Sequence, residues 1–303
     1  MAVPISSAPL LEARNLTKLY GNVQALDSAS FTVGPGITGL LGPNGAGKST
    51  AIRIFLGLTD ATSGSALVMG DDTRDPYART RLGYMPEHDC LPPNQSAANF
   101  LTHMAEVSGI PPSRSRALAA DTLRHVGLFE ERYRPIGGYS TGMKQRVKLA
   151  QALVHDPVLI LLDEPTAGLD PTGRTEMLNL IRRIAREFGI SVVLSTHLMQ
   201  DVERTCDNIV LLDLGRVKES SDVASLTQET ELIYVEVANN RDRFAAELTN
   251  RNIEHTSEGI AVSIPDVDGA KFDAVRDALV ASEARLVRMG PRQRALIDLF
   301  RSN

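Results

Sequence analysis

The stretch GPNGAGKST, from Gly42 to Thr50, has the spacing G-x-x-x-x-G-K-[ST] of a phosphate-binding loop. Its glycines let successive backbone N–H groups curl around phosphate oxygens, and a helix that follows directs its positive N-terminal end at the same anion. We expect Lys48 to contact the β- and γ-phosphates and the Ser49 hydroxyl to ligate Mg²⁺. The sequence thus predicts a nucleoside triphosphate site formed by Gly42, Pro43, Asn44, Gly45, Ala46, Gly47, Lys48, Ser49 and Thr50.

The residues on either side of this loop supply the strand and the helix that it requires. Residues 37–41 (ITGLL) form an apolar run that is typical of a buried strand, and residues 51–56 (AIRIFL) continue as a helix. The alternative is a chance glycine-rich turn. The strand-loop-helix order makes that alternative the weaker interpretation.

Composition sets the broad class of the chain. Its 303 residues carry a formal net charge of −5 and can bury a sizeable core, in one large domain or in a large and a small one. The acidic balance argues against a nucleic-acid partner. Cys90 and Cys206 lie far apart without metal-site spacing, which is typical of thiols in a reducing cytoplasm. Without a signal-peptide pattern or an apolar run near about 18 residues, we expect a cytoplasmic chain that does not span a membrane.

The order of patterns along the chain indicates a parallel α/β sheet with two additions. Short alternating strands over residues 10–33 predict an antiparallel β subdomain, and a helical insert is expected at about 90–155. Strands then alternate with helices, as in parallel sheets. The expected strands are 65–69, 81–85, 158–162, 191–195 and 208–212, and the expected helices are 96–126 with a break at 109–112, 141–154, 171–188 and 198–205.

The pattern changes beyond about Ser220, so we expect two domains, at 10–220 and 221–303. The second has the order of a ferredoxin-like β-α-β-β-α-β unit, a small α+β domain. We expect it to serve in docking, dimerisation or stability. Its expected strands are 232–237, 254–256, 259–264 and 284–289, and its expected helices are 241–250 and 271–281.

An acidic pair follows the apolar run at residues 158–162. Asp163 lies where a phosphate-bound Mg²⁺ needs a carboxylate on the facing strand end. Glu164 is placed one residue further on, where it could accept a proton from an attacking water. The alternative for Glu164 is a surface residue before Pro165, and spacing alone does not separate the two interpretations.

Several motifs together resemble those of the ATP-binding cassette ATPases. After GPNGAGKST come YSTGMKQR at 139–146, VLILLDEPTAGLDP at 158–171 and STH at 195–197, in the family's order. The resemblance covers about residues 10–220 and implies a P-loop α/β fold, ATP and Mg²⁺ as ligands, and hydrolysis of ATP with Lys48, Glu164 and His197 as catalytic residues. By this resemblance His197 reaches the γ-phosphate, although a lone histidine after a strand is often structural.

The resemblance also implies a composite site between two subunits. Ser140, Thr141 and Gly142 match the signature motif, whose helix faces an ATP held by the other subunit. A plain helix cap by Ser140 uses the same geometry. Asp170 matches the aspartate that contacts the dimer partner, and Tyr20 matches the aromatic residue that stacks on adenine, although an aromatic residue at a strand end is otherwise usually core.

One position departs from the family pattern. Glu87 stands where much of the family has glutamine. A carboxylate there could still bind Mg²⁺ or water, so Glu87 joins Ser49 and Asp163 as a candidate metal ligand. By resemblance, the segments near Glu87 and at 96–109 are the expected contact with a membrane partner.

The resemblance implies an ATPase subunit that pairs with a second copy and with separate membrane permease subunits, on the inner face of the cell membrane. The motif wording resembles exporters of drugs, antibiotics, lipids or polysaccharides more than importers. One alternative is a soluble cassette ATPase that acts on ribosomes or DNA, and the acidic composition weighs against it. Another is a regulator without turnover, but Lys48, Asp163, Glu164 and His197 are all present.

Overall fold

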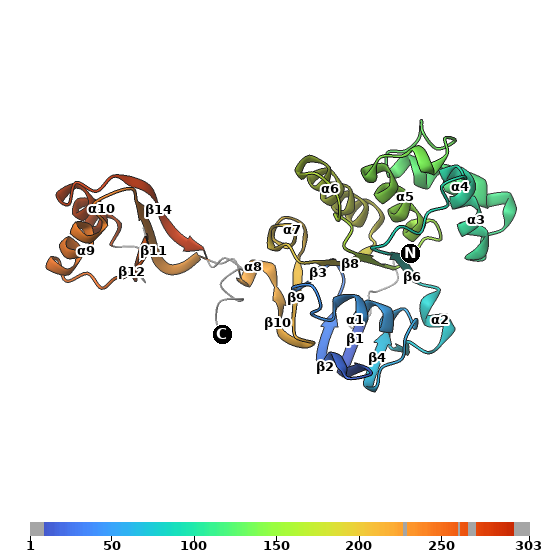
Figure 1. The fold of residues 1–303 in the computed structure, drawn as a ribbon, viewed down its shortest axis with the longest axis horizontal. Helices are drawn as coiled ribbons and strands as arrows, with labels where there is room; N and C mark the ends of the chain where they lie inside the picture. Colours follow the sequence, from blue (N-terminus) through green and yellow to red (C-terminus); the bar gives the residue numbers. More distant parts are fainter. Residues whose placement is uncertain (1–8, 227–228, 260, 266–270, 294–303) are drawn as a thin grey trace, which may run out of the picture. The chain divides into compact units, whose positions relative to one another are not determined.

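A computed structural model describes residues 9–226, 229–259, 261–265 and 271–293. The chain divides into two compact units, with the division between Val223 and Ala224. Figure 1 shows both units. Within the described ranges, no helix combines the length and the apolar character needed to cross a membrane.

A largely parallel sheet forms the centre of the first unit. Its described strands run in the order β10-β9-β3-β8-β7-β6, and only the β10 and β9 pair is antiparallel. All five residues of β3 and of β7 are buried, as expected for strands covered on both faces. The parallel sheet that the sequence predicts is thus confirmed. The strands are β3 (Ile37–Leu41), β6 (Leu82–Met85), β7 (Leu159–Asp163), β8 (Ser191–Thr196), β9 (Asn208–Asp213) and β10 (Arg216–Asp222).

An antiparallel sheet in the order β2-β1-β4-β5 opens the unit, as predicted. Its strands are β1 (Leu11–Tyr20), β2 (Val23–Val33), β4 (Ser63–Val68) and β5 (Asp71–Asp72). The expectation of short strands over 10–33 is wrong, because β1 and β2 pair along nearly their whole length and absorb the irregular pattern as register shifts. Helix α1 (Lys48–Phe55) packs between the two sheets, where Ile52 and Phe55 share one core with Leu16 of β1 and Leu161 of β7.

Helices α5, α6 and α7 lie on the other side of the parallel sheet from α1 (Figure 1). The expected helical insert is present, and its break at 109–112 separates α3 from α4, with Gly109 at a φ of 88°. Serine and aspartate side chains cap four of the helices given below, at Asp75, Ser96, Ser140 and Asp170. The helices are α2 (Pro76–Arg79), α3 (Ala97–Val107), α4 (Pro112–His125), the 3₁₀ turn η1 (Ile136–Gly138), α5 (Thr141–Leu153), α6 (Pro171–Phe188) and α7 (Met199–Thr205).

The second unit has the predicted β-α-β-β-α-β order. Its sheet runs β12-β13-β11-β14 with antiparallel neighbours, which is the ferredoxin-like arrangement. Phe244 and Val275 from the two helices pack on Ile233, Val235 and Val262 of the sheet. After α8 (Val223–Leu226) come β11 (Glu229–Val237), α9 (Arg241–Asn250), β12 (Thr256–Glu258), β13 (Ala261–Pro265), α10 (Phe272–Ala281) and β14 (Leu286–Gln293).

Candidate active site

The phosphate-binding loop joins the end of β3 to the start of α1. Gly47 precedes α1 with a φ of 103°, and no side chain caps the helix, so its first amides point into the loop. Two glycines have no room for a side chain. A Cβ on Gly42 would lie 2.3 Å from the Leu212 carbonyl oxygen, and one on Gly47 would lie 2.5 Å from that of Ala25. The loop is therefore shaped by its packing to leave backbone N–H groups for an anion.

Lys48 lies within this loop. Its side chain is only 6% exposed, and Nζ donates to the carbonyl oxygens of Gly42 at 2.7 Å and Pro43 at 3.1 Å. The same nitrogen lies 3.6 Å from Oε1 of Glu164. A buried ammonium needs such partners to offset its loss of hydration. Lys48 is thus held between the loop and the end of β7, with its charge beside the acidic pair.

Asp163 forms the centre of a hydrogen-bond network at the ends of β7 and β8. Its Oδ1 accepts hydrogen bonds from Ser49 Oγ at 3.0 Å and from Ser195 Oγ at 2.7 Å. Ser195 is completely buried, and its Oγ also accepts a hydrogen bond from the Glu164 backbone N–H at 3.0 Å. One hydroxyl therefore fixes the side chain of Asp163 and the backbone of Glu164.

Ser195 is a residue that the sequence analysis did not assign to the site. A serine at the end of the apolar run Val192–Leu194 was the available signal, because a polar residue that continues a buried strand must have a hydrogen-bond partner.

Glu164 and His197 meet at the ends of the same neighbouring strands. Nδ1 of His197 lies 3.2 and 3.1 Å from the two carboxylate oxygens of Glu164. Because an ionised carboxylate only accepts hydrogen bonds, Nδ1 carries the hydrogen. Glu164 is 8% exposed and has a φ of 47°, a conformation that is uncommon for residues other than glycine. This arrangement can hold a carboxylate base beside Lys48.

Ser49 and Asp163 fit a magnesium site. A hydroxyl and a carboxylate are oxygen ligands, and Mg²⁺ usually completes its shell with substrate phosphates and water. Across the part of the chain that the structure describes, no three His, Cys, Asp or Glu side chains gather as a metal site. Glu87 is exposed in the loop after β6. The described residues therefore supply a partial shell of the kind that a phosphate-bound ion needs.

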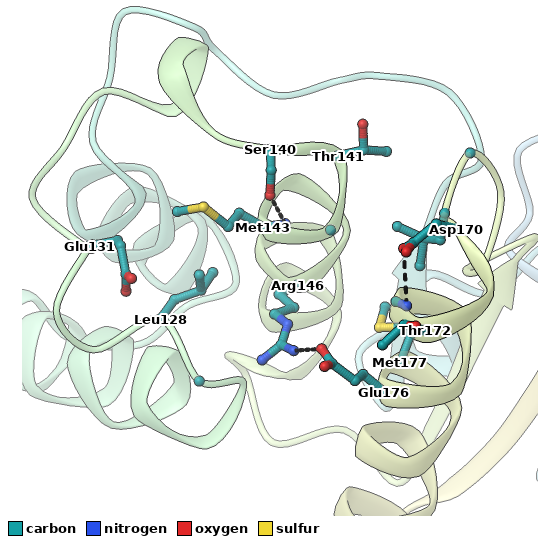
Figure 2. A pocket seen from close by; sticks show the side chains of 15 residues that line it. Leu128, Glu131, Ser140, Thr141, Met143, Arg146, Asp170, Thr172, Glu176 and Met177 are labelled. Atoms are coloured by element: carbon teal, nitrogen blue, oxygen red, sulfur yellow. Dashed lines mark hydrogen bonds and ion pairs between the residues drawn. The ribbon is translucent and has the colours of Figure 1, made fainter.

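The signature residues lie at a second site, around the start of α5. Ser140 caps α5 by accepting a hydrogen bond from the Met143 backbone N–H at 3.3 Å, and both Ser140 and Thr141 are exposed. They border a cavity of about 540 Å³ between the first turns of α5 and α6 (Figure 2). Asp170 lies on its rim and caps α6 through the Gly173 N–H at 3.1 Å. This site presents a helix N-terminus to the outside of the chain.

An ion pair spans the second site. Arg146 on α5 and Glu176 on α6 both line the cavity, and their side chains meet at 2.9 Å (Figure 2). The pair joins the two helices whose first turns carry the signature residues and Asp170.

Tyr20 lies at the end of β1 and is 44% exposed, with Lys18 Nζ 5.0 Å from its ring centroid. It is not a core residue in this structure. An exposed ring at a strand end is available for stacking.

Comparison with known proteins identifies the family. The family described as "ABC transporter" matches residues 26–167. The linearmycin resistance ATP-binding protein LnrL of Bacillus subtilis is 31% identical over 90% of this chain and 89% of its own length. The chain belongs to the ABC transporter family. A Nod factor export ATP-binding protein I of Burkholderia orbicola is 35% identical over 77% of both chains.

Solved structures agree with this assignment. The ABC ATPase resembles the solved structure of an ATP-binding subunit of an ABC transporter, with a TM-score of 0.63, 30% identity, and coverage of 72% of this chain and 91% of that one. It is the ATP-binding subunit of a transporter. This subunit hydrolyses ATP and works with membrane permease components. The alternative of a ribosome or DNA factor finds no support in these comparisons.

Proposed function

We propose that this ABC ATPase powers export through separate permease subunits, at the inner face of the cell membrane. The observation that supports ATP hydrolysis by this chain is the close placement of Lys48, Glu164 and His197. Lys48 Nζ and His197 Nδ1 both lie within 3.6 Å of the Glu164 carboxylate. The direction of transport rests on relatives named for Nod factor export and linearmycin resistance. The transported substrate is recognised mainly by the permease subunits.

The residues of the first site divide the work of hydrolysis. The loop amides and Lys48 bind the β- and γ-phosphates and offset their charge. Glu164 accepts a proton from the attacking water, and His197 orients Glu164 and reaches toward the γ-phosphate. Ser49 and Asp163, with Glu87 as a further candidate, would hold Mg²⁺, which supplies charge stabilisation to the phosphates when bound. Tyr20 stacks on the adenine ring.

The second site completes the first in a dimer. Ser140, Thr141 and Gly142 of one copy present the positive end of α5 to the ATP that is held by the other copy. Asp170 borders the same surface. A homodimer contains two such composite sites. The two copies close on two ATP molecules and separate after hydrolysis, and this movement drives transport. Residues 10–220 perform this cycle, and residues 221–303 serve docking, dimerisation or stability.

This proposal is tested by a substitution that removes the base but leaves the phosphate-binding loop and Lys48 intact. Glu164→Gln is expected to bind ATP, to lose hydrolysis, and to accumulate as an ATP-bound dimer in light scattering. Glu203→Gln, an exposed position on α7, is the matched control and is expected to behave as wild type. Unchanged turnover in Glu164→Gln would contradict the role of this residue.

The partner is tested by affinity purification from solubilised membranes. The expected result is recovery of a polytopic membrane protein with this ATPase. Ribosome co-sedimentation without such a partner would contradict the transporter role.

A further inference from the structure

A buried lysine on α5 gathers the loop that carries Glu87. The Lys148 side chain is 4% exposed, and its Nζ lies 2.9 Å from the Pro86 carbonyl oxygen, 2.8 Å from that of Glu87 and 3.5 Å from that of His88. An ammonium group has three N–H donors, so these consecutive carbonyls match its full hydrogen-bonding capacity. The loop must curl around Nζ to bring them to one point, and this leaves Glu87 exposed.

Two other residues of α5 contact the same loop. Lys144 Nζ lies 3.4 Å from Asp89 Oδ2, and Gln151 faces the Cys90 thiol at 4.0 Å. With Lys148, these positions are spaced i, i+4 and i+7, so they share one face of the helix. Beyond the end of α5, the His155 ring lies 2.9 Å from the Leu82 carbonyl oxygen of β6.

The backbones of β6 and α5 also pack closely. A Cβ on Gly83 would lie 1.9 Å from the Ala152 carbonyl oxygen. The strand β6, the Glu87 loop and helix α5 therefore pack as one block. Among the contacts described above, that of Lys148 joins three carbonyl groups of the loop to a single charge.

Burial of the Lys148 ammonium group costs free energy unless hydrogen bonds within the protein replace its lost hydration. Desolvation lowers the pKa of Lys148, although the nearby carboxylates of Asp89, Glu87 and Asp163 oppose that shift. An apolar residue would pack at this position without such a cost. The carbonyl cage is therefore the contribution that distinguishes lysine here from a core side chain.

We propose that Lys148 is a positioning residue that fixes Glu87 relative to the signature residues at Ser140. The proposal rests on the proposed function, in which Glu87 acts on Mg²⁺ or water. Lys148 and Ser140 are joined by about two turns of one helix, roughly 12 Å of rigid structure. A displacement of the Glu87 loop by a membrane subunit is thereby passed to the start of α5, which faces the other copy's ATP.

Lys148→Met tests the clamp, because methionine keeps an unbranched chain and removes the donors and the charge. It is expected to lower kcat by about 10- to 100-fold, as loss of an orienting contact does, and to leave the Kd for ATP without Mg²⁺ unchanged. Lys144→Met is the matched control on the same helix face. Its half-exposed ion pair with Asp89 is worth little, so a change below about twofold is expected.

A double-mutant cycle separates positioning of Glu87 from a general structural role. If Lys148 acts through Glu87, Lys148→Met causes little further loss in a Glu87→Ala background. The same fold-loss in both backgrounds overturns the proposal. Glu87→Ala with wild-type turnover also overturns it, while the ATPase roles of Lys48 and Glu164 are tested by their own variants and are unaffected.

Two further variants keep the test decisive if Lys148→Met does not fold. Lys148→Arg retains charge and donors and is expected to restore part of kcat. Lys148→Gln is expected to speed amide hydrogen exchange of residues 87–90 relative to Lys144→Gln. Equal exchange in these two variants contradicts a clamp on the loop.

Discussion

The phosphate-binding site and the signature site differ in how far each is completed within the chain. In the first, Lys48, Ser49, Asp163 and Glu164 all hydrogen-bond or pair with one another or with the loop. In the second, Ser140 and Thr141 are exposed beside a cavity of about 540 Å³. The side chains of the first site are fixed by contacts within the chain, whereas the second presents a helix N-terminus at an exposed surface.

The largest expected effect comes from disabling each site in turn. Lys48→Ala is expected to abolish hydrolysis and to weaken ATP binding by the isolated chain. Gly142→Asp places a negative charge in the first turn of α5, where the other copy's ATP is proposed to bind, and is expected to reduce kcat by about 10²- to 10³-fold. Steady-state ATPase assays and nucleotide titrations measure both.

The contrast between these variants lies in binding. Gly142→Asp is expected to keep the wild-type Kd of the isolated chain for ATP, because the first site is untouched. A Cβ at Gly142 has only Leu169 Cδ2 nearby, at 3.8 Å, and an acidic residue suits the start of a helix, so the fold is retained. Equal loss of ATP binding in both variants would mean that the two sites are not separate within one chain.

The second prediction concerns Ser195, which holds the first site in shape. Ser195→Ala removes the hydroxyl that binds Asp163 and the Glu164 N–H, and is expected to lower kcat by about 10- to 100-fold. Ser195→Thr keeps a hydroxyl and is expected to recover part of the activity. The measurement is kcat with its dependence on Mg²⁺ concentration.

Ser191→Ala on the same strand is the control for Ser195→Ala. Its Oγ accepts a hydrogen bond from the Gly36 N–H at 3.4 Å, at the opposite end of β8 from the site. It is expected to change stability without changing the Mg²⁺ dependence. If the two alanine variants lose turnover equally, Ser195 has no particular role at the site.

The third prediction compares the free energy of unfolding after substitution of one glycine in the first site and one glycine in the second site. Gly42→Ala brings a Cβ to 2.3 Å from the Leu212 carbonyl oxygen and is expected to lower the free energy of unfolding by about 1–3 kcal/mol. A Cβ in Gly142→Ala makes only an ordinary contact, at 3.8 Å from Leu169 Cδ2, and the substitution within a helix is expected to raise the free energy of unfolding by up to about 1 kcal/mol. Urea unfolding measures both, and a destabilised Gly142→Ala would contradict an open second site.

The smallest effect is expected at Asp201, which anchors the segment between the two sites. Its Oδ2 accepts a hydrogen bond from Thr166 Oγ1 at 3.0 Å, and burial raises its pKa above 3.8. The folded chain therefore favours protonated Asp201, so this residue's contribution to stability is greatest below pH 3.8 and is lost as pH rises through the folded-state pKa.

Asp201→Asn tests that sign, because the amide is neutral at every pH and still offers an oxygen to Thr166. The variant is expected to exceed wild type in unfolding free energy at pH 7, by a margin that shrinks on acidification. A margin that grows toward acid pH would show that ionised Asp201 is stabilising.

Local chemistry explains which parts of the fold were predictable. Helix α6 has the expected bounds because Asp170 caps it, Pro171 begins it and Gly189 ends it with a φ of 66°. The β-α-β-β-α-β order of the second unit was also visible from alternating apolar positions. By contrast, the lengths of β1 and β2 depend on bulges, which leave no periodic pattern in the sequence.

The site was predictable where a motif supplied it and hidden where packing did. Lys48, Ser49 and Asp163 follow from spacing, and the structure brings them together. Ser195 and Lys148 were missed because their partners lie far away in the sequence. Ser195 contacts the Asp163 carboxylate and the Glu164 N–H, and Lys148 contacts backbone carbonyls that include that of Glu87, 61 residues away, which no local pattern reveals. The positive φ of Glu164 is likewise a consequence of packing.

The most direct test of two sites that complete each other is activity in a mixture of two disabled chains. Lys48→Ala lacks a working first site, and Gly142→Asp lacks a working second site, so each alone is expected to be inactive. In a mixed dimer, one composite site joins the intact loop of one chain to the intact signature helix of the other. Mixing is therefore expected to restore ATP hydrolysis, and a mixture no more active than the sum of its two separate chains would contradict a composite site.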